Sequence, residues 1–298
     1  MKYLFTILSI LTFSFSTDAQ NYHENHEVFG INKAAPHAQL FPFENKQLAW
    51  QGEMKYSDRF LSLNGLWKFN WVRDPADKPV GFEGVDFDDQ GWIDFPVPGN
   101  WEVHGYGYPI YLDEKYPFTT TWPKVPEHYN PVGSYRRSFD IPANWQGQGI
   151  HLYFGAVKSA LYVWVNGEFV GFSQGSKTPA EFDITKYVQT GKNTIALQIY
   201  RWSDASYIES QDMLRLSGIE REVYVYARPK TNIREFFAKS GLDQEYQDGE
   251  LNTTVEIVNQ ADKTQEVQLG LKLYDLQEGH RLVYEEKKEV MLAATENK

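Results

Sequence analysis

Hydrophobic and polar residues alternate in short stretches along most of this chain, beginning near residue 59. A period of two places successive side chains on opposite faces of an extended strand, so that one face can be buried. Turn-forming residues separate the stretches at short intervals, which is typical of a β-sandwich. The pattern therefore predicts an all-β, jelly-roll fold over residues 59–228, with the strand order left open. The predicted strands cover residues 60–63, 66–71, 92–98, 134–141, 150–154, 161–165, 169–172, 194–200 and 222–226.

Two Asn-Gly dipeptides, at residues 64–65 and 166–167, stand between predicted strands. This dipeptide tolerates positive φ at both positions, as a two-residue hairpin turn requires. We therefore predict a hairpin at each site. Pro96 and Pro98 confine the strand at 92–98 to a sheet edge, because proline has no N–H to donate to a neighbouring strand.

Residues 99–133 show little periodicity and are rich in Gly, Pro and aromatic residues. An irregular connection of this length is usually functional or packed against other parts of the chain. The many aromatic side chains favour a packed loop over a flexible one.

The pattern changes character after Arg228-Pro229. Alternating strands are predicted at 250–258 and 266–273, with two shorter ones at 282–284 and 289–292. They resemble the start of an immunoglobulin-like sandwich, which needs roughly 100 residues and seven strands. Only about 70 residues follow the boundary, so an incomplete immunoglobulin-like domain is predicted over residues 229–298.

The N-terminal residues 1–19 have the features of a secretory signal peptide: Lys2, an apolar run, and small residues at Thr17 and Ala19. The run is shorter than the roughly 20 residues of a membrane span, and no later stretch is apolar enough to be one. We therefore expect an exported protein, periplasmic or extracellular. Residues 20–58 are irregular and predict an extended arm. The arm contains His23, His26 and His37, without the carboxylate or Cys spacing of a metal site.

Composition narrows the function classes. The chain has 298 residues, 42% hydrophobic and 23% charged, enough for about two folded domains. Aromatic residues make up 16%, which suits β-sheet cores and also flat platforms for sugar rings. The net charge of −11 argues against a nucleic-acid partner, because a phosphate backbone would be repelled. The absence of Cys excludes disulfides, thiolate metal sites and a Cys nucleophile.

No nucleophile elbow, P-loop, dinucleotide fingerprint or HExxH motif occurs. Glycoside hydrolysis requires two carboxylates facing each other across the scissile bond. Glu209 and Asp212 form a close acidic pair in a loop, but scaffolding of a turn, or ion pairs with Arg201 and Arg215, explain them equally well.

Asp204 is the sharper candidate because it follows directly after the predicted strand 194–200. A carboxylate at that position could ligate a hard cation or accept a hydrogen bond from a sugar hydroxyl. The competing interpretation is an Asp that accepts N–H groups of a turn. The sequence pattern leaves both open.

Five separated segments, in order, resemble the N-terminal sugar-binding domain of the bacterial β-galactosidases of glycoside hydrolase family 2. The segments are SLNGLWKFNW (62–71), VPGNWEVHGYGYPIYLDEKYPF (97–118), NPVGSYRRSF (130–139), SALYVWVNGEFVGFSQGSKTPAEFDIT (159–185) and RWSDASYIESQDMLRLSGIEREV (201–223). The resemblance implies a retaining β-galactosidase acting on terminal non-reducing β-D-galactose residues. In this family, the jelly-roll domain lends loops to an active site on a following barrel that carries the catalytic glutamates.

The resemblance also implies roles for individual residues. The RWSD match assigns Asp204 to substrate contact and to a bound Na⁺ or K⁺ ion. A family asparagine that contacts the sugar aligns with Thr121, a departure from the family pattern in which the Thr hydroxyl could replace the amide in part. No catalytic residue is expected in this sequence, so the 298-residue chain is expected to be inactive alone. The resemblance allows Mg²⁺ or another divalent ion on the barrel, and a homo-oligomer.

Two alternatives remain open from the sequence. The chain could be a stand-alone carbohydrate-binding module without catalysis. It could also belong to a relative that acts on β-glucuronides or β-mannosides, because the barrel contributes most of the specificity.

Overall fold

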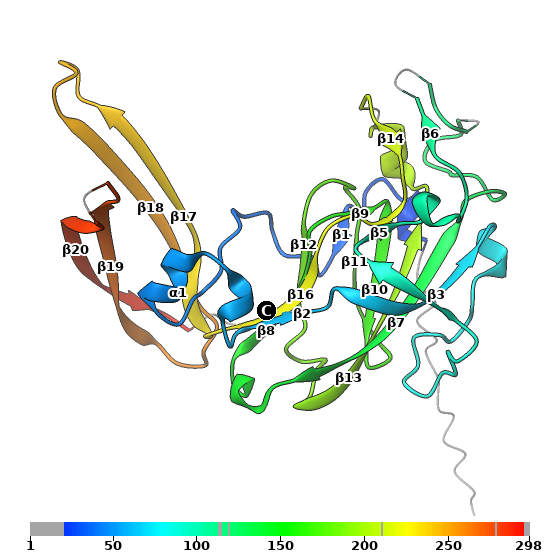
Figure 1. Ribbon diagram of the computed structural model, residues 1–298, viewed down its shortest axis with the longest axis horizontal. Helices are drawn as coiled ribbons and strands as arrows, with labels where there is room; N and C mark the ends of the chain where they lie inside the picture. Colours follow the sequence, from blue (N-terminus) through cyan, green and yellow to red (C-terminus); the bar gives the residue numbers. More distant parts are fainter. Residues whose placement is uncertain (1–20, 113–114, 119, 210, 278, 295–298) are drawn as a thin grey trace, which may run out of the picture.

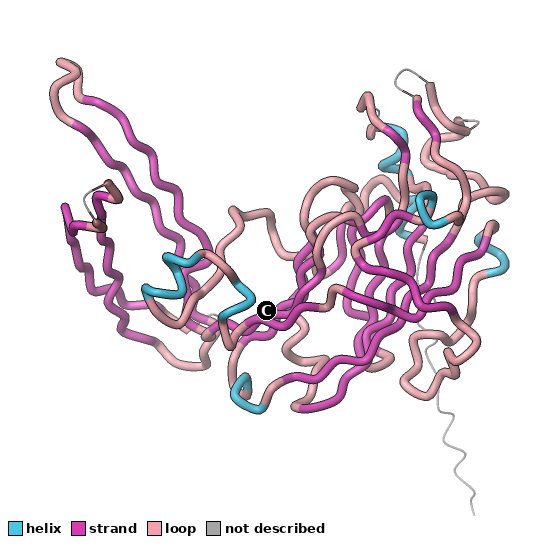
Figure 2. Tube along the Cα trace, viewed as in Figure 1, coloured by secondary structure: helices cyan, strands magenta, loops and turns pink. Residues whose placement is uncertain are grey.

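The computed structural model describes residues 21–112, 115–118, 120–209, 211–277 and 279–294; the predicted leader at 1–19 lies outside them. Within the described residues the chain is almost entirely β-strand and loop, with one α-helix, α1 (Lys46–Gln51), and short 3₁₀ turns (Figures 1 and 2). The prediction of an all-β fold is confirmed. No helix among these residues is long and apolar enough to span a bilayer.

The larger layer of the sandwich is a seven-stranded antiparallel sheet. In spatial order its strands are β1 (Gly30–Ile31), β11 (Glu168–Ser173), β10 (Ala160–Val165), β13 (Gly191–Tyr200), β7 (Val132–Ile141), β3 (Gly65–Val72) and β4 (Ile93–Val97). The central pair, β13 and β7, stays in register from Gly191 opposite Ile141 to Tyr200 opposite Val132. β4, which contains Pro96, lies at the sheet edge as predicted.

The second layer is a four-stranded sheet in the order β12 (Ala180–Asp183), β8 (Gly149–Phe154), β16 (Val223–Arg228) and β2 (Phe60–Ser62). The main core lies between the layers. Alternate residues of β13 (Ile195, Leu197 and Ile199) are fully buried there, together with Leu152 and Val225 of the second sheet. This alternation explains why a period of two predicted the strands correctly.

The predicted hairpin at residues 64–65 is wrong. β2 pairs with β16 in the second sheet, whereas β3 pairs with β4 and β7 in the first, so the chain crosses between layers here. The Asn64 Oδ1 atom accepts a hydrogen bond from the Val223 N–H at 2.9 Å, a long-range contact that no local pattern reveals. The hairpin at 166–167 is present between β10 and β11, and both turn residues have positive φ.

Two small sheets lie at the end of the sandwich where β13 terminates. One contains β5 (Gly99–Asn100), β15 (Gly218–Ile219) and β9 (Val157–Lys158), and the other pairs β6 (Ile110–Tyr111) with β14 (Leu214–Arg215) (Figure 1). The long loop before β7 is packed here in part: Trp101 is buried, whereas Tyr108, Tyr111, Tyr116 and Trp122 are about half exposed. Trp101 is fully buried and its Nε1–H donates to Tyr135 Oη at 2.5 Å.

After residue 229 the chain forms two long hairpins, seen on the left of Figure 1. β17 (Thr231–Leu242) pairs with β18 (Gly249–Asn259), and β19 (Gln265–Asp275) pairs with β20 (Arg281–Leu292). The sequence did not predict β17, whose register shifts between Ile233 and Glu235 and so breaks the alternation. The two short strands predicted at 282–284 and 289–292 are one continuous strand. The charged middle of β20 is exposed on both faces, so the sequence shows no alternation of buried and exposed residues there that would predict a strand.

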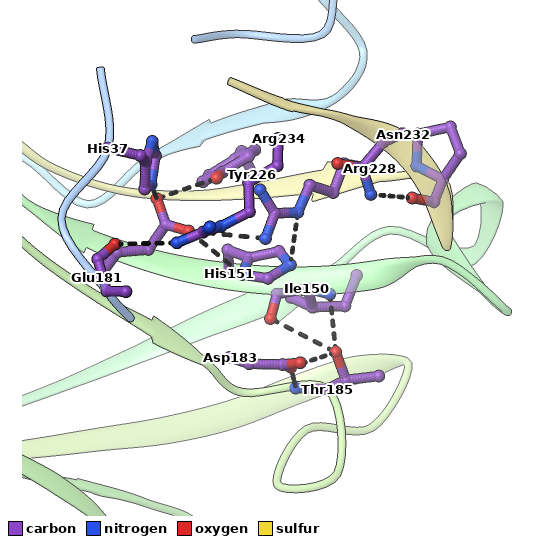
Figure 3. Close-up of polar contacts among 12 residues, drawn as sticks. His37, Ile150, His151, Glu181, Asp183, Thr185, Tyr226, Arg228, Asn232 and Arg234 are labelled. Carbon is purple, nitrogen blue, oxygen red and sulfur yellow. Dashed lines mark hydrogen bonds and ion pairs between the residues drawn. The ribbon is translucent and has the colours of Figure 1, made fainter. Parts of the chain in front are cut away.

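Part of the N-terminal segment crosses the outside of the second sheet. The Ala34 N–H donates to the Glu181 carbonyl at 2.8 Å. Figure 3 shows a polar cluster beside this contact, where the Glu181 carboxylate lies between His37, His151 and Arg228. The Tyr226 hydroxyl donates to Glu181 at 2.9 Å. These contacts join the arm, β12, β8 and β16.

Candidate functional site

The backbone of the three residues that follow β13, 201–203, is held by hydrogen bonds. Arg201 N–H donates to the Pro131 carbonyl at 2.9 Å. The buried Asn130 side chain then contacts both backbone groups of Trp202: it accepts from the N–H at 2.8 Å and donates to the carbonyl at 3.2 Å. Ser203 starts the 3₁₀ turn η6 (Asp204–Tyr207) with a capping box. Asp204 is therefore presented by a rigid segment.

Asp204 is a buried carboxylate without a partner. Its side chain belongs to a residue only 1% exposed, and neither carboxylate oxygen has a hydrogen-bond partner of acceptable distance and angle among the described residues. Burial raises the pKa of Asp204, while the nearby Gln174 side chain and the Ala205 N–H oppose part of that rise. A buried polar group left without partners is costly, and such groups concentrate at functional sites.

Asp204 differs from an Asp that satisfies a turn completely. Asp183 illustrates that role, because its Oδ1 accepts from the Thr185 N–H at 2.9 Å and from the Thr185 hydroxyl at 2.5 Å. Around Asp204 the Gln174 side chain and the Ala205 N–H lower the pKa, but neither makes a hydrogen bond of acceptable distance and angle with the carboxylate within the described chain. The carboxylate of Asp204 thus has acceptor capacity that the fold does not use.

Thr121 lies on the loop that packs against η6. Its N–H donates to Tyr207 Oη at 2.9 Å, and Tyr207 Oη in turn donates to the Lys124 carbonyl at 2.6 Å. Tyr207 therefore ties the loop of Thr121 to the turn that carries Asp204. The Thr121 residue is exposed. Both predicted site residues thus lie at the same end of the sandwich.

The acidic pair Glu209 and Asp212 does not form a facing pair. Glu209 accepts hydrogen bonds from the Ser176 N–H at 2.6 Å and the Ser176 hydroxyl at 2.5 Å. Asp212 accepts from the Tyr111 hydroxyl. Each acid has its own structural partner, so nothing in this arrangement resembles the two carboxylates of a glycosidase centre.

Arg201 pairs with an acid that the sequence did not single out. Its Nη1 lies 3.4 Å from Glu102 Oε1, and both side chains are buried. Glu102 Oε2 also accepts the Ser217 N–H at 2.8 Å. The suggested ion pairing of Arg201 with Glu209 or Asp212 is therefore wrong. A buried guanidinium needs a counter-charge close by, and tertiary folding supplies it from the 99–133 loop.

A buried lysine, Lys158, lies near the site and was also missed. Its Nζ atom has no hydrogen-bond partner in the described part of the chain, and burial lowers the pKa of Lys158 to about 8. The next residue, Ser159, donates from its hydroxyl to Ser203 Oγ at 3.1 Å, one residue before Asp204. The local sequence does not indicate that Lys158 and Ser159 lie near the site, because it is the pairing of β9 with β15 that brings this strand there.

The described residues contain no group of three or more His, Asp or Glu side chains arranged to hold a metal ion. His23 stacks on Tyr200 with ring centroids 4.0 Å apart and contacts Tyr162 Oη at 2.9 Å. His37 lies 3.5 Å from Glu181. Both of these arm histidines have packing partners on the sandwich.

Comparison with known proteins assigns the part of the chain that forms this sandwich to a family. The model of the "Glycosyl hydrolases family 2, sugar binding domain" matches residues 60–229, more than half of the chain. The chain belongs to glycosyl hydrolase family 2. The matched residues include every strand of the two sheets except β1, and the whole of the site segment from β13 to β16.

The relatives in this family include bacterial β-galactosidases. The chain is 41% identical over 271 residues to a β-galactosidase of Priestia megaterium, covering 88% of this chain and 26% of the relative. It is 40% identical over 252 residues to one of Halalkalibacterium halodurans, covering 83% and 24%. The chain therefore spans about a quarter of the length of these curated relatives.

Solved structures support the same fold. A Bacteroides uniformis β-glucuronidase superimposes with a TM-score of 0.65 at 22% identity, covering 80% of this chain and 26% of that chain. A family 2 member from Bacteroides cellulosilyticus DSM 14838 gives a TM-score of 0.58 at 23% identity, covering 80% of this chain and 30% of that one. At these identities the likeness concerns the fold alone.

Proposed function

We propose that this chain is the sugar-binding part of a retaining β-galactosidase and contributes Asp204 to the substrate site. The observation that carries the proposal is the buried Asp204 carboxylate just after β13, neither of whose oxygens has a hydrogen bond of acceptable distance and angle within the described chain. The β-galactosidase relatives, at 35–42% identity, support galactosides as the substrate class. In this proposal Asp204 accepts a hydrogen bond from a galactose hydroxyl.

The same carboxylate would hold a Na⁺ or K⁺ ion. Hard cations prefer oxygen ligands, and Asp204 provides two oxygens. The Gln174 Oε1 atom is likewise buried without a partner, and Gln174 lies near Asp204. These oxygen atoms would supply part of the coordination shell of a monovalent cation, and water or sugar hydroxyls would complete it. A divalent ion such as Mg²⁺ is proposed only for the barrel that the family resemblance implies.

Catalysis requires groups beyond those described. A retaining glycosidase places two carboxyl groups about 5–5.5 Å apart, one as nucleophile and one as acid and base. Glu209 and Asp212 hold separate structural partners instead. We therefore propose that the 298-residue chain binds galactosides without hydrolysing them, and that the catalytic glutamates belong to the barrel. Thr121 is proposed as a minor sugar contact from the neighbouring loop.

Binding and turnover test the proposal together. We expect the purified chain to bind lactose or methyl β-galactoside by isothermal calorimetry or ligand-observed NMR, more tightly in NaCl or KCl than in choline chloride. Asp204→Asn should weaken binding about tenfold or more, since a charge-assisted hydrogen bond is lost. The matched control Asp183→Asn removes one negative charge from a turn outside the site and should leave binding unchanged. Turnover of a chromogenic β-galactoside by the chain, or unchanged binding by Asp204→Asn, would overturn the proposal.

A carboxylated sugar gives a further comparison. Methyl β-glucuronide would bring a second carboxylate close to that of Asp204, and like charges at such distances disfavour binding. We expect the galactoside to bind more tightly than the glucuronide. The reverse order would favour a glucuronidase relative.

We also propose that the protein is exported. Residues 1–19 support this through their signal-peptide pattern. N-terminal sequencing of the protein recovered from the periplasm or medium should begin at Gln20, whereas recovery with Met1 intact from the cytoplasm would contradict export.

A further inference from the structure

A groove beside the site segment has no assigned role. It encloses about 540 Å³, within the range of small-ligand pockets, and is formed by the 107–129 loop, Arg73 and the end of β13. Its walls are largely aromatic. We call it the aromatic groove, and the side chains used here are Arg73, Tyr108, Phe118, His128, Tyr129 and Trp202.

The aromatic walls are held rigidly. Tyr108 and Tyr129 stack with centroids 5.0 Å apart and an interplanar angle of 16°. Tyr129 adopts a left-handed conformation with φ of 58°, unusual for a bulky residue, and its N–H is held by Asp74 Oδ1 at 2.5 Å. Backbone of this kind persists only where the surroundings enforce it, and it is concentrated at binding sites.

A buried cation supports the floor of the groove. The Arg201 guanidinium lies 5.5 Å from the Tyr108 ring, 5.8 Å from Tyr129 and 4.8 Å from Trp202. Its counter-charge, Glu102, is also buried. Cation–π contacts of this kind lock the three rings in one arrangement. The groove is therefore preorganised, which lowers the entropic cost of binding a ligand.

The groove also offers polar groups at its exposed rim. Arg73 lies 5.2 Å from the Tyr129 ring and, with His128, is exposed to solvent. Tyr108 is 52% exposed, although it is stacked on one side. Flat rings combined with the exposed guanidinium of Arg73 and imidazole of His128 suit a sugar, whose C–H face stacks on aromatics while its hydroxyls form hydrogen bonds.

The groove adjoins the proposed galactose site through one wall. Trp202 lines the groove and lies two residues before Asp204, so their Cα atoms are within about 7 Å. We infer that the aromatic groove binds the second neutral sugar ring on the aglycone side, which is the third sugar counted from the terminal galactose that meets Asp204, an inference that rests on the proposed function. The protein would thus favour oligosaccharides of three or more sugars over disaccharides.

The test compares a disaccharide with a trisaccharide on the full 298-residue chain. We expect galactosyl-lactose to bind about tenfold more tightly than lactose, the gain that one aromatic stacking contact supplies. Tyr108→Ala should remove that gain, and Tyr108→Phe should keep it. The control Tyr246→Ala changes another exposed tyrosine, in the β17–β18 turn, and should have no effect. Arg73→Ala provides a second groove variant, at an exposed position, if Tyr108→Ala does not fold.

Each outcome separates the two proposals. Equal affinities for lactose and galactosyl-lactose in the parent chain, as expected for a groove that receives another protein segment, would overturn the inference. So would a gain that persists in both Tyr108→Ala and Arg73→Ala. Asp204→Asn should weaken both sugars by the same factor and leave their ratio unchanged. If Asp204→Asn has no effect but the ratio still depends on Tyr108, the groove stands and the galactose site fails.

Discussion

Replacing Asp204 by Asn should stabilise the folded chain at neutral pH, although we propose that the same change weakens sugar binding. The Asp204 carboxylate is buried without a hydrogen bond of acceptable geometry in the described part of the chain, and its pKa is raised by that burial. An unsatisfied buried polar group costs about 1–3 kcal/mol, and more when it is charged. Asn keeps the shape and the polar cost but removes the charge, so we expect a gain of about 1 kcal/mol. In a domain of this size that corresponds to about 2–4 °C in Tm.

The pH dependence of this gain has a definite sign. Below the ordinary Asp pKa of 3.8, both folded and unfolded states carry a protonated Asp204, so the variant and the parent should be equally stable. Above 3.8 the unfolded state ionises first, because the folded-state pKa is raised. The advantage of Asp204→Asn should therefore appear as the pH rises and be complete once the folded parent has ionised.

Urea unfolding of parent and variant at pH 3 and pH 7 measures the effect. Asp183→Asn is the matched control, because it removes the same charge from a chain with net charge −11 at an exposed turn. Its stability should fall by no more than about 1 kcal/mol, because the Asn oxygen still accepts the two Thr185 hydrogen bonds without the assistance of the charge. If Asp204→Asn is less stable than the parent at pH 7, Asp204 supports the turn after all. The interpretation that the turn does not use the Asp204 carboxylate, on which the proposed site depends, would then be refuted.

Three further changes test contacts that hold the sandwich together. Burial lowers the pKa of His151 from 6.5 to about 4, so the unfolded state binds the proton first. About 3 kcal/mol of folding stability should therefore be lost as the pH falls from above 6.5 to about 4. Urea unfolding midpoints measured between pH 7 and 4 should show this loss. If the stability of His151→Gln falls as steeply with pH as that of the parent, His151 is not its cause. Glu102→Gln leaves the buried guanidinium of Arg201 without its counter-charge and should cost about 3 kcal/mol in urea unfolding; a cost under about 0.5 kcal/mol would mean that the pair is not desolvated. Gly133→Ala places a Cβ in steric conflict with the edges of the Trp101 and Phe69 rings and should cost about 1–3 kcal/mol; an unchanged melting curve would refute that packing.

Identical dipeptides in this chain show how far local sequence reaches. Residues 166–167 form the expected hairpin because β10 and β11 are neighbours in one sheet. Residues 64–65 do not, because β2 pairs with β16, more than 150 residues later. A local pattern predicts that the chain can turn, but the partner of each strand depends on the packing of both sheets.

Strands with one buried face were predictable, and strands without one were not. β13 buries alternate residues against the second sheet, so its pattern has a clear period of two. β17 and β20 are largely exposed, and their pairing is carried by backbone hydrogen bonds that do not depend on side-chain pattern. The missed strand and the divided strand both lie in this region for that reason.

The amino-acid sequence alone determined the all-β class. Through motifs in a fixed order, it also indicated the family and singled out Asp204 as the candidate site residue. These follow from side-chain periodicity and from residue types at fixed spacing, which are local properties. Only the tertiary structure decided that the Asp204 carboxylate is buried without a partner, that Asn130 holds the backbone before it, and that Arg201 pairs with Glu102. Those features depend on loops distant in sequence meeting at one end of the sandwich, and the free energy that brings them together is the burial of the shared core.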